Sequence, residues 1–141
     1  MALTYLHAIH DSVNGSIKFI EILRTDPALT LGYLEIPQVS KSAAYTTVIG
    51  DSGKHLLHPS ADTTARTFTI DSNANVPYPI GTAITFVNQA SAGTLTIAIT
   101  TDTMRLAGPG TTGSRTLAAN GIATALKVTS TEWIISGTGL T

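Results

Sequence analysis

The feature that most constrains the fold is an alternation of threonine with apolar residues at every second position. It runs through residues 67–70, 83–87 and 94–99. Successive side chains of a strand point to opposite faces, so a period of two is typical of a half-buried β-strand. Threonine is β-branched and fits a pleated face, and its hydroxyl group tolerates water. The pattern predicts a chain built of strands.

Turn sequences rich in Gly, Pro, Asn and Asp separate these segments, with tight turns predicted at residues 14–15, 51–53 and 120–121. About ten short strands spaced in this way indicate an all-β fold, an antiparallel β-sandwich or barrel with an N-terminal hairpin or arm. The predicted strands cover residues 3–12, 16–24, 45–49, 54–58, 64–70, 82–88, 94–99, 103–107, 122–129 and 131–135.

The composition changes near residue 40. Residues 1–40 hold two of the four His and two of the four Tyr, whereas the rest of the chain is rich in Thr, Gly and Ala. We therefore predict an N-terminal hairpin or arm over residues 1–42 and a β-sandwich or barrel domain over residues 43–141. An arm of this size buries too little surface for a core of its own. We expect it to pack on its own domain or on another subunit.

Charge is scarce, and this excludes several classes of protein. Charged residues make up 12% of the chain, against about 25% in an ordinary soluble domain. The 30 residues between Asp71 and Asp102 carry no charge, but Pro77, Pro79 and Gly81 interrupt them, so we predict no membrane partner. A formal net charge of −1 gives no cationic excess for phosphates, so we predict no nucleic-acid partner. The absence of cysteine excludes disulfides and thiolate metal sites.

No pattern of residues predicts catalysis, a cofactor or a metal site. The glycines at 108, 110 and 113 have the spacing of a dinucleotide-binding loop, but no helix is predicted after them. His7 and His10, like His55 and His58, are three residues apart and would point to opposite faces of a strand. Only a symmetry axis shared by three subunits could gather such histidines around a metal. We predict a protein that is not an enzyme and holds no cofactor or metal.

Trp133 allows two interpretations. It is the only tryptophan and lies in the last predicted strand. An exposed indole ring would suit stacking on a carbohydrate, whereas a buried one would belong to the core or to an interface. No other aromatic residue is close to it in the sequence, which favours the core or an interface.

A series of short segments runs through residues 44–137 in a fixed order. They are YTTV at 45–48, DSGK at 51–54, TFTI at 67–70, VPYPIGT at 76–82, AGTLTI at 92–97, ALKV at 125–128 and EWIISG at 132–137. This order resembles a β module of tailed-bacteriophage virion proteins, which occurs in tail fibres, spikes and head-decoration proteins. The resemblance covers about two-thirds of the chain.

The resemblance implies a non-enzymatic protein, often trimeric, that is built into the virion. We expect a homotrimeric capsid decoration (cement) protein on the outer surface of the head, made in the host cytoplasm, with the major capsid protein as its partner. A protein that binds only the assembled shell stabilises it by mass action. The alternative is a tail-fibre, tail-tip or spike module that binds glycans of the host surface.

We place the predicted interface on the N-terminal arm and on the loop that contains two prolines. Aromatic and aliphatic side chains dominate this set, as they do at the centres of protein interfaces. The candidate residues are Tyr5, His7, Ile9, Phe19, Ile22, Tyr33, Leu34, Pro77, Tyr78 and Pro79.

Overall fold

The computed structural model describes residues 6–10, 17–21 and 35–141, and the chain divides into two compact units, Met1–Glu35 and Ile36–Thr141. In the first unit, β1 (Leu6–His10) pairs antiparallel with β2 (Ile17–Glu21). Both strands lie within segments predicted to be strands. The turn predicted at residues 14–15 lies outside the described residues.

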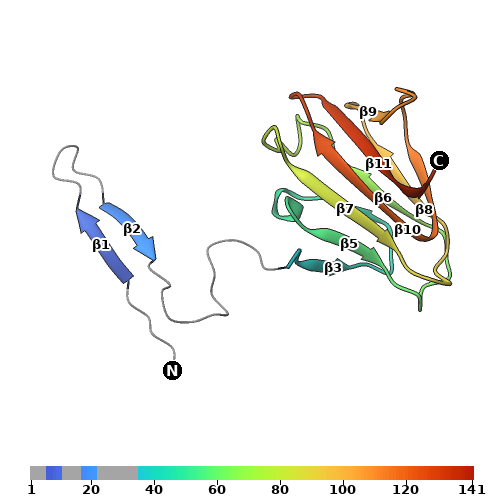
Figure 1. Ribbon diagram of the computed structural model, residues 1–141, viewed down its shortest axis with the longest axis horizontal. Helices are drawn as coiled ribbons and strands as arrows, with labels where there is room; N and C mark the ends of the chain where they lie inside the picture. The colour runs from blue at the N-terminus through green and yellow to red at the C-terminus, as the bar shows by residue number, and fades with distance from the viewer. Residues whose placement is uncertain (1–5, 11–16, 22–34) are drawn as a thin grey trace. The chain divides into compact units, whose positions relative to one another are not determined.

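The second unit holds a single sheet, coloured from cyan to red in Figure 1. No α-helix occurs in the described residues, so the fold is almost entirely β, as the alternation predicted. A short 3-10 helix, η1 (Ile49–Asp51), follows the second strand of this sheet. The strands are β3 (Gln38–Ser40), β4 (Tyr45–Thr46), β5 (His55–His58), β6 (Arg66–Ile70), β7 (Ala83–Asn88), β8 (Leu95–Ile99), β9 (Thr103–Leu106), β10 (Arg115–Lys127) and β11 (Glu132–Leu140).

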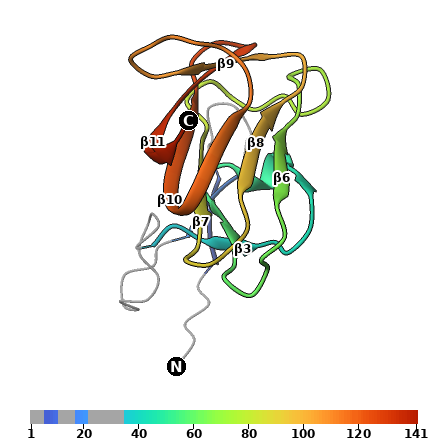
Figure 2. The ribbon, with the colours of Figure 1, turned by 90° about the vertical axis from the view of Figure 1, so that its right-hand side faces the viewer.

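The path of the chain through this sheet alternates between two halves. The strand order is β3-β5-β7-β10-β8-β6-β4, so β3, β5 and β7 form one half and β4, β6 and β8 form the other. The long strand β10 joins the halves, because residues 121–126 pair with β7 and residues 115–117 pair with β8. β11 pairs with β10, and β9 pairs with β11. The sheet curls around its own core, as the turned view in Figure 2 shows.

The prediction of an antiparallel sandwich or barrel of ten strands is not confirmed, because the sheet is mixed. Its parallel pairs are β3–β5, β5–β7, β4–β6, β6–β8 and β9–β11. Consecutive strands from β3 to β8 do not pair with each other. β3, β4, β5 and β6 each pair with the next strand but one, after the chain has crossed to the other half and returned. A parallel pair needs such a crossover, and here a strand of the opposite half supplies it.

The tight turn predicted at residues 120–121 is wrong, because the chain continues through both residues as part of β10. Asn120 has a left-handed backbone with φ of 62°. The pairing of β10 with β11 shifts register between Leu117 and Ile122. Asn and Gly accept unusual backbone angles in bulges as well as in hairpin turns. The pair therefore bends one strand between the two halves of the sheet.

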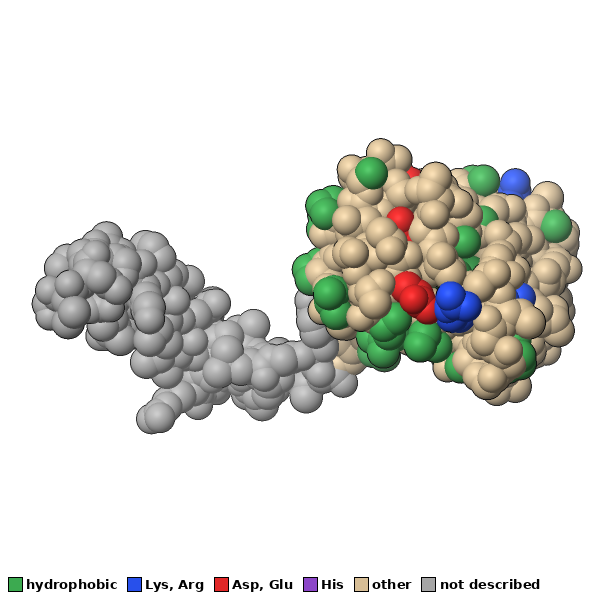
Figure 3. Space-filling view, turned by 90° about the horizontal axis from the view of Figure 1, so that it is seen from above, with side chains coloured by type: hydrophobic (Ala, Val, Ile, Leu, Met, Phe, Trp, Pro, Cys, Tyr) green, Lys and Arg blue, Asp and Glu red, His purple; other side chains and the backbone are tan. Residues whose placement is uncertain are grey.

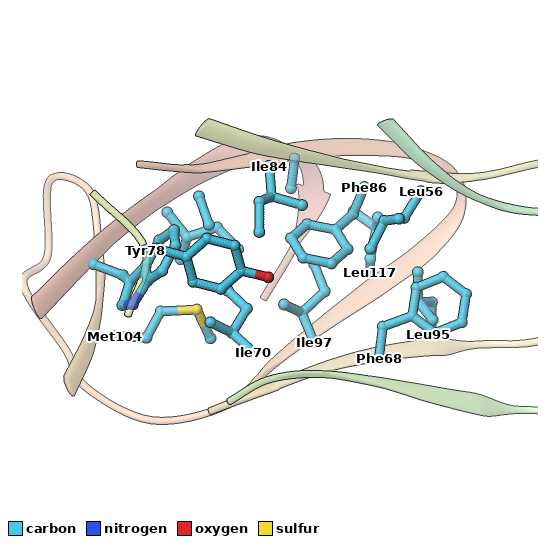
Figure 4. Packing of buried hydrophobic residues seen from close by; sticks show 14 residues of the cluster. Leu56, Phe68, Ile70, Tyr78, Ile84, Phe86, Leu95, Ile97, Met104 and Leu117 are labelled. Carbon is cyan, nitrogen blue, oxygen red and sulfur yellow. The ribbon is translucent and has the colours of Figure 1, made fainter. Parts of the chain in front are cut away.

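The core lies on the concave side of the curled sheet, and Figure 4 shows its side chains meeting from both halves. On β7 the odd positions are partly exposed, and the even positions Ile84, Phe86 and Asn88 are buried. The buried hydrophobic residues are Leu56, Phe68, Ile70, Tyr78, Ile84, Phe86, Ala92, Leu95, Ile97, Met104, Leu117, Ala123, Ala125, Trp133 and Ile135.

Candidate interaction surface

The convex side of the sheet presents three rows of uncharged residues on β7, β10 and β11. The register aligns Ala83 with Leu126 and Leu126 with Ile134. The next rows are Thr85, Thr124 and Ser136, and then Val87, Ile122 and Thr138. Alternation along each strand turns these residues away from the core. We call these nine residues the neutral face: Ala83, Thr85, Val87, Ile122, Thr124, Leu126, Ile134, Ser136 and Thr138.

Large aliphatic side chains of the neutral face are open to solvent. Ile122 is 50% exposed, Leu126 42% and Ile134 38%. No ionisable residue occurs in residues 83–88, 116–126 or 133–141. Monomeric soluble proteins carry both signs of charge over most of their surface, so a wide face without charge is typical of a surface that binds another protein. Figure 3 shows how few charged side chains appear in the view from above.

A hydrogen bond holds the middle row of the neutral face together. The hydroxyl groups of Thr85 and Thr124 lie 2.9 Å apart across β7 and β10. Such cross-strand threonine pairs stabilise a sheet and occupy each other's polar atoms. The two threonine hydroxyl groups of the middle row are therefore paired with each other, and Ser136 in the same row is exposed.

The loop that contains the two prolines extends this surface at the end of β10. Gly81 N–H donates to the carbonyl of Lys127 at 2.8 Å, which ties the loop to the strand. Pro77 and Pro79 are exposed, and Ile80 is 67% exposed. Val48 and Ile49, near η1, are also about half exposed. The loop thus adds aliphatic surface next to the row of Ala83, Leu126 and Ile134.

The structure places Tyr78, a predicted interface residue, in the core. It is only 3% exposed, and its hydroxyl donates to the carbonyl of Val48 at 2.6 Å. Its ring meets the Trp133 ring edge-on, with centroids 5.5 Å apart. Burial raises the pKa of Tyr78 to about 12. Tyr78 therefore positions its loop against η1, and the prolines on either side of it remain at the surface.

A second tyrosine fixes the turn on which Val48 lies. The Tyr45 hydroxyl donates to Asp51 Oδ2 at 2.9 Å, and Val48 N–H donates to the same oxygen at 2.8 Å. Burial, followed by the hydrogen bond to Asp51, raises the pKa of Tyr45 to about 12. The Lys41 amine lies 4.1 Å from the centroid of the Tyr45 ring. These contacts hold the exposed Val48 in a defined place.

A second cluster of ionisable side chains, formed by His58, Asp62 and Arg66, lies in the second unit and stabilises its structure. His58 is fully buried, and its Nδ1 donates to Asn88 Oδ1 at 2.9 Å, because the Asn88 amide nitrogen donates to two carbonyls. His58 Nε2 lies 3.2 Å from Asp62 Oδ2 without good hydrogen-bond alignment. Asp62 accepts two bonds from Arg66, and these hold the pKa of Asp62 well below its usual value. His58 is fully buried, so the imidazole has no access to a substrate from solvent.

A polar cleft of about 390 Å³ opens beside β9. Four hydroxyl side chains, one carboxylate and one guanidinium contribute to its walls. Arg105 in this cleft donates to Glu132 Oε1 at 2.5 Å. The lining residues are Ile99, Thr100, Asp102, Thr103, Met104, Arg105, Thr112, Gly113 and Ser114. Such a cleft could accept a ligand rich in hydroxyl groups, but it offers no aromatic ring for stacking.

Trp133 is fully buried, so it forms no exposed carbohydrate platform, and the core interpretation holds. Among the described residues, no group of three His, Asp or Glu side chains could hold a metal ion. No helix in this part of the chain is long and apolar enough to cross a membrane. Side chains of the predicted arm residues Tyr5, His7, Ile9, Phe19, Ile22, Tyr33 and Leu34 lie outside what the structure describes.

The sequence prediction did not single out the neutral face. The signal was present, because Ile122, Thr124 and Leu126 alternate with the buried Ala123 and Ala125. Alternation alone does not tell which set faces the core, since both sets are apolar or nearly so. A comparison of the sequence with protein-family models and with curated proteins finds no match.

Proposed function

We propose that this chain is a structural protein of a tailed-phage virion that works by covering other protein surfaces. In its most specific form the proposal is a homotrimeric decoration protein that binds the major capsid protein and stabilises the assembled head. The neutral face carries the proposal. Its exposed aliphatic side chains and lack of charge suit packing against protein, because a buried interface tolerates unpaired charge poorly.

The rigid construction of the face also supports a binding role. Its strands are central to the sheet and rest on a packed core, and the loop beside it is fixed by the hydrogen bonds of Gly81 and Tyr78. A preformed surface loses little conformational freedom on binding, which favours affinity. Three copies joined in this way would bind a repeating shell at several points at once, and multivalency strengthens such binding.

The polar cleft favours a second candidate function. In this alternative, the chain is a tail-fibre, tail-tip or spike module and the cleft binds a glycan of the host surface. The hydroxyl groups of Thr100, Thr103 and Thr112, together with Asp102, offer donors and acceptors for sugar hydroxyls. The absence of an exposed aromatic ring in the cleft makes this candidate the weaker one.

Two measurements test the proposal. Sedimentation equilibrium of the full chain at micromolar concentration should give a trimer, and a monomer would contradict the oligomeric part. Co-sedimentation should then show binding to phage heads that lack decoration, with no binding to cells of the host. Binding to cells without binding to heads would overturn the decoration proposal in favour of the second candidate.

A further inference from the structure

A lysine at the end of β10 lies in the core without an acidic partner. Lys127 is only 1% exposed, on the same side of the strand as the buried Ala123 and Ala125. Among the described residues, no carboxylate lies within ion-pair distance of its amine. Lysine is almost never fully buried unless it is paired. The surroundings of this amine therefore need an explanation.

The amine contacts the side-chain amide of an asparagine from a distant segment. Lys127 Nζ lies 2.6 Å from Asn73 Oδ1, although the two residues are 54 positions apart in sequence. It also lies 5.6 Å from the centroid of the buried Trp133 ring. Asp102 contacts the backbone of the same asparagine: its Oδ2 accepts a hydrogen bond from the backbone N–H of Asn73 at 3.0 Å. The amine and the side-chain amide thus meet beside an aromatic ring, and the carboxylate fixes the backbone of the asparagine.

Backbone contacts hold both reacting groups in place. Lys127 exchanges hydrogen bonds with the segment after the proline loop, through its N–H to Thr82 and its carbonyl to Gly81, at 2.9 and 2.8 Å. Asn73 lies in a turn closed by hydrogen bonds from residues 75 and 76 to Ser72. Holding two groups in contact replaces an encounter in solution by a step within one molecule, which accelerates reaction by a large factor.

We propose that Lys127 and Asn73 join spontaneously in an isopeptide bond. The amine of Lys127 attacks Asn73 Cγ in its deprotonated form, so that a bond forms between Nζ and Cγ and the bond between Cγ and Nδ2 breaks. A proton passes from the attacking nitrogen to the leaving nitrogen, which departs as ammonia. The products are one secondary amide and one ammonia, and no oxidant or further reactant is needed.

The bond would close a large loop across the core. It would connect the turn after β6 to the end of β10, and so restrict the unfolded chain in the way that a disulfide does. The chain has no cysteine with which to make a disulfide. An amide cross-link resists reducing conditions and suits a protein that must keep its shape.

Mass spectrometry of the intact, denatured chain tests the proposal. After incubation to constant mass, the wild-type chain should be lighter than its sequence by one ammonia, about 17 Da. Digestion with trypsin should give one branched peptide that joins residues 67–105 to residues 116–141, because trypsin does not cleave after an acylated lysine. Asn73→Ala should keep the full mass, and the neighbouring Asn75→Ala should still lose ammonia.

Other outcomes would overturn the inference. A wild-type chain at full mass, folded by circular dichroism, would show that the contact remains a hydrogen bond. Loss of ammonia without the branched peptide would identify a succinimide at an asparagine instead of the cross-link. None of these results depends on whether the chain forms trimers or binds capsids.

Discussion

Leu126 of β10 lies directly opposite Ile134 of β11, and both side chains are exposed, by 42% and 38%. The pair stabilises the two strands through cross-strand contact. Its outer surface nevertheless stays in water, next to other uncharged residues of the neutral face. Covering that surface by another protein would recover the free energy of burying apolar area, about 25 cal/mol per Å².

A charge placed in this pair should disrupt the proposed assembly. Leu126→Asp should weaken self-association by about tenfold or more, because an unpaired carboxylate in an interface is costly. The circular dichroism spectrum should stay native, since the side chain points away from the core. Sedimentation velocity measures the change. Ala90→Asp, in the exposed turn after β7, is the matched control and should assemble normally. Equal association of the two variants would exclude the neutral face as the interface.

Neighbouring isoleucines on β11 should differ sharply in their effect on stability. Ile135 is fully buried and Ile134 is 38% exposed. Ile135→Ala should lower the free energy of unfolding by about 2–5 kcal/mol, because it leaves a cavity. Ile134→Ala should lower it by less than about 1 kcal/mol. Urea denaturation at one protein concentration makes the comparison. Similar losses would mean that the assignment of the two faces of β11 is incorrect.

Gly137 should tolerate no side chain. A Cβ atom there would lie 2.2 Å from the carbonyl oxygen of Ile122 on β10. Gly137→Ala must therefore push two paired strands apart, and we expect a loss of about 1–3 kcal/mol in thermal or urea unfolding. Gly50→Ala is the control, because nothing lies within 4 Å of a Cβ atom at that site. A Gly137→Ala variant as stable as Gly50→Ala would contradict the close approach.

The sequence was sufficient to predict the β class and most strands, because local alternation determines which segments are extended. It could not predict the partners of the strands. A strand such as β6 alternates in the same way whether its neighbour is parallel or antiparallel. The assumption that consecutive strands form hairpins led to an antiparallel fold. Strand β3 was not predicted, because three residues are too few for a periodic signal.

The candidate surface was predicted less well than the fold. The proline loop was predicted as an interface, and Pro77 and Pro79 are exposed, but Tyr78 between them fills the core. The sequence gives no sign that the Tyr78 hydroxyl would reach Val48, 30 residues away. The Lys127–Asn73 contact spans a still longer separation, so only the folded chain could reveal it.

The ionic cluster of Asp62 predicts a dependence of stability on acid. Arg66 is the main cause that lowers the pKa of folded Asp62 below the usual 3.8, and His58 contributes. The unfolded chain therefore binds a proton at Asp62 more readily than the folded chain does. The stabilisation is present above pH 3.8 and is lost as the pH falls through the lower pKa of the folded state.

The matching experiment is urea unfolding of the wild type and of Asp62→Asn from pH 6 down to pH 2. The variant should lack this part of the loss of stability in acid. Glu35→Gln changes an exposed carboxylate outside the cluster and serves as the control. Parallel pH profiles for the wild type and Asp62→Asn would show that the folded chain does not favour ionised Asp62.

Tyr45 predicts the opposite behaviour in alkali. Burial first, and then the hydrogen bond to Asp51, raises its pKa from 10.0 to about 12. The unfolded chain therefore loses this proton first, and stability should fall as the pH rises from about 10 to about 12. The phenolate absorbance of the wild type minus that of Tyr45→Phe isolates this group. Asp51→Asn should move the Tyr45 transition toward lower pH, because the carboxylate that opposes the phenolate is gone. An unchanged transition in Asp51→Asn would show that burial alone accounts for the raised pKa.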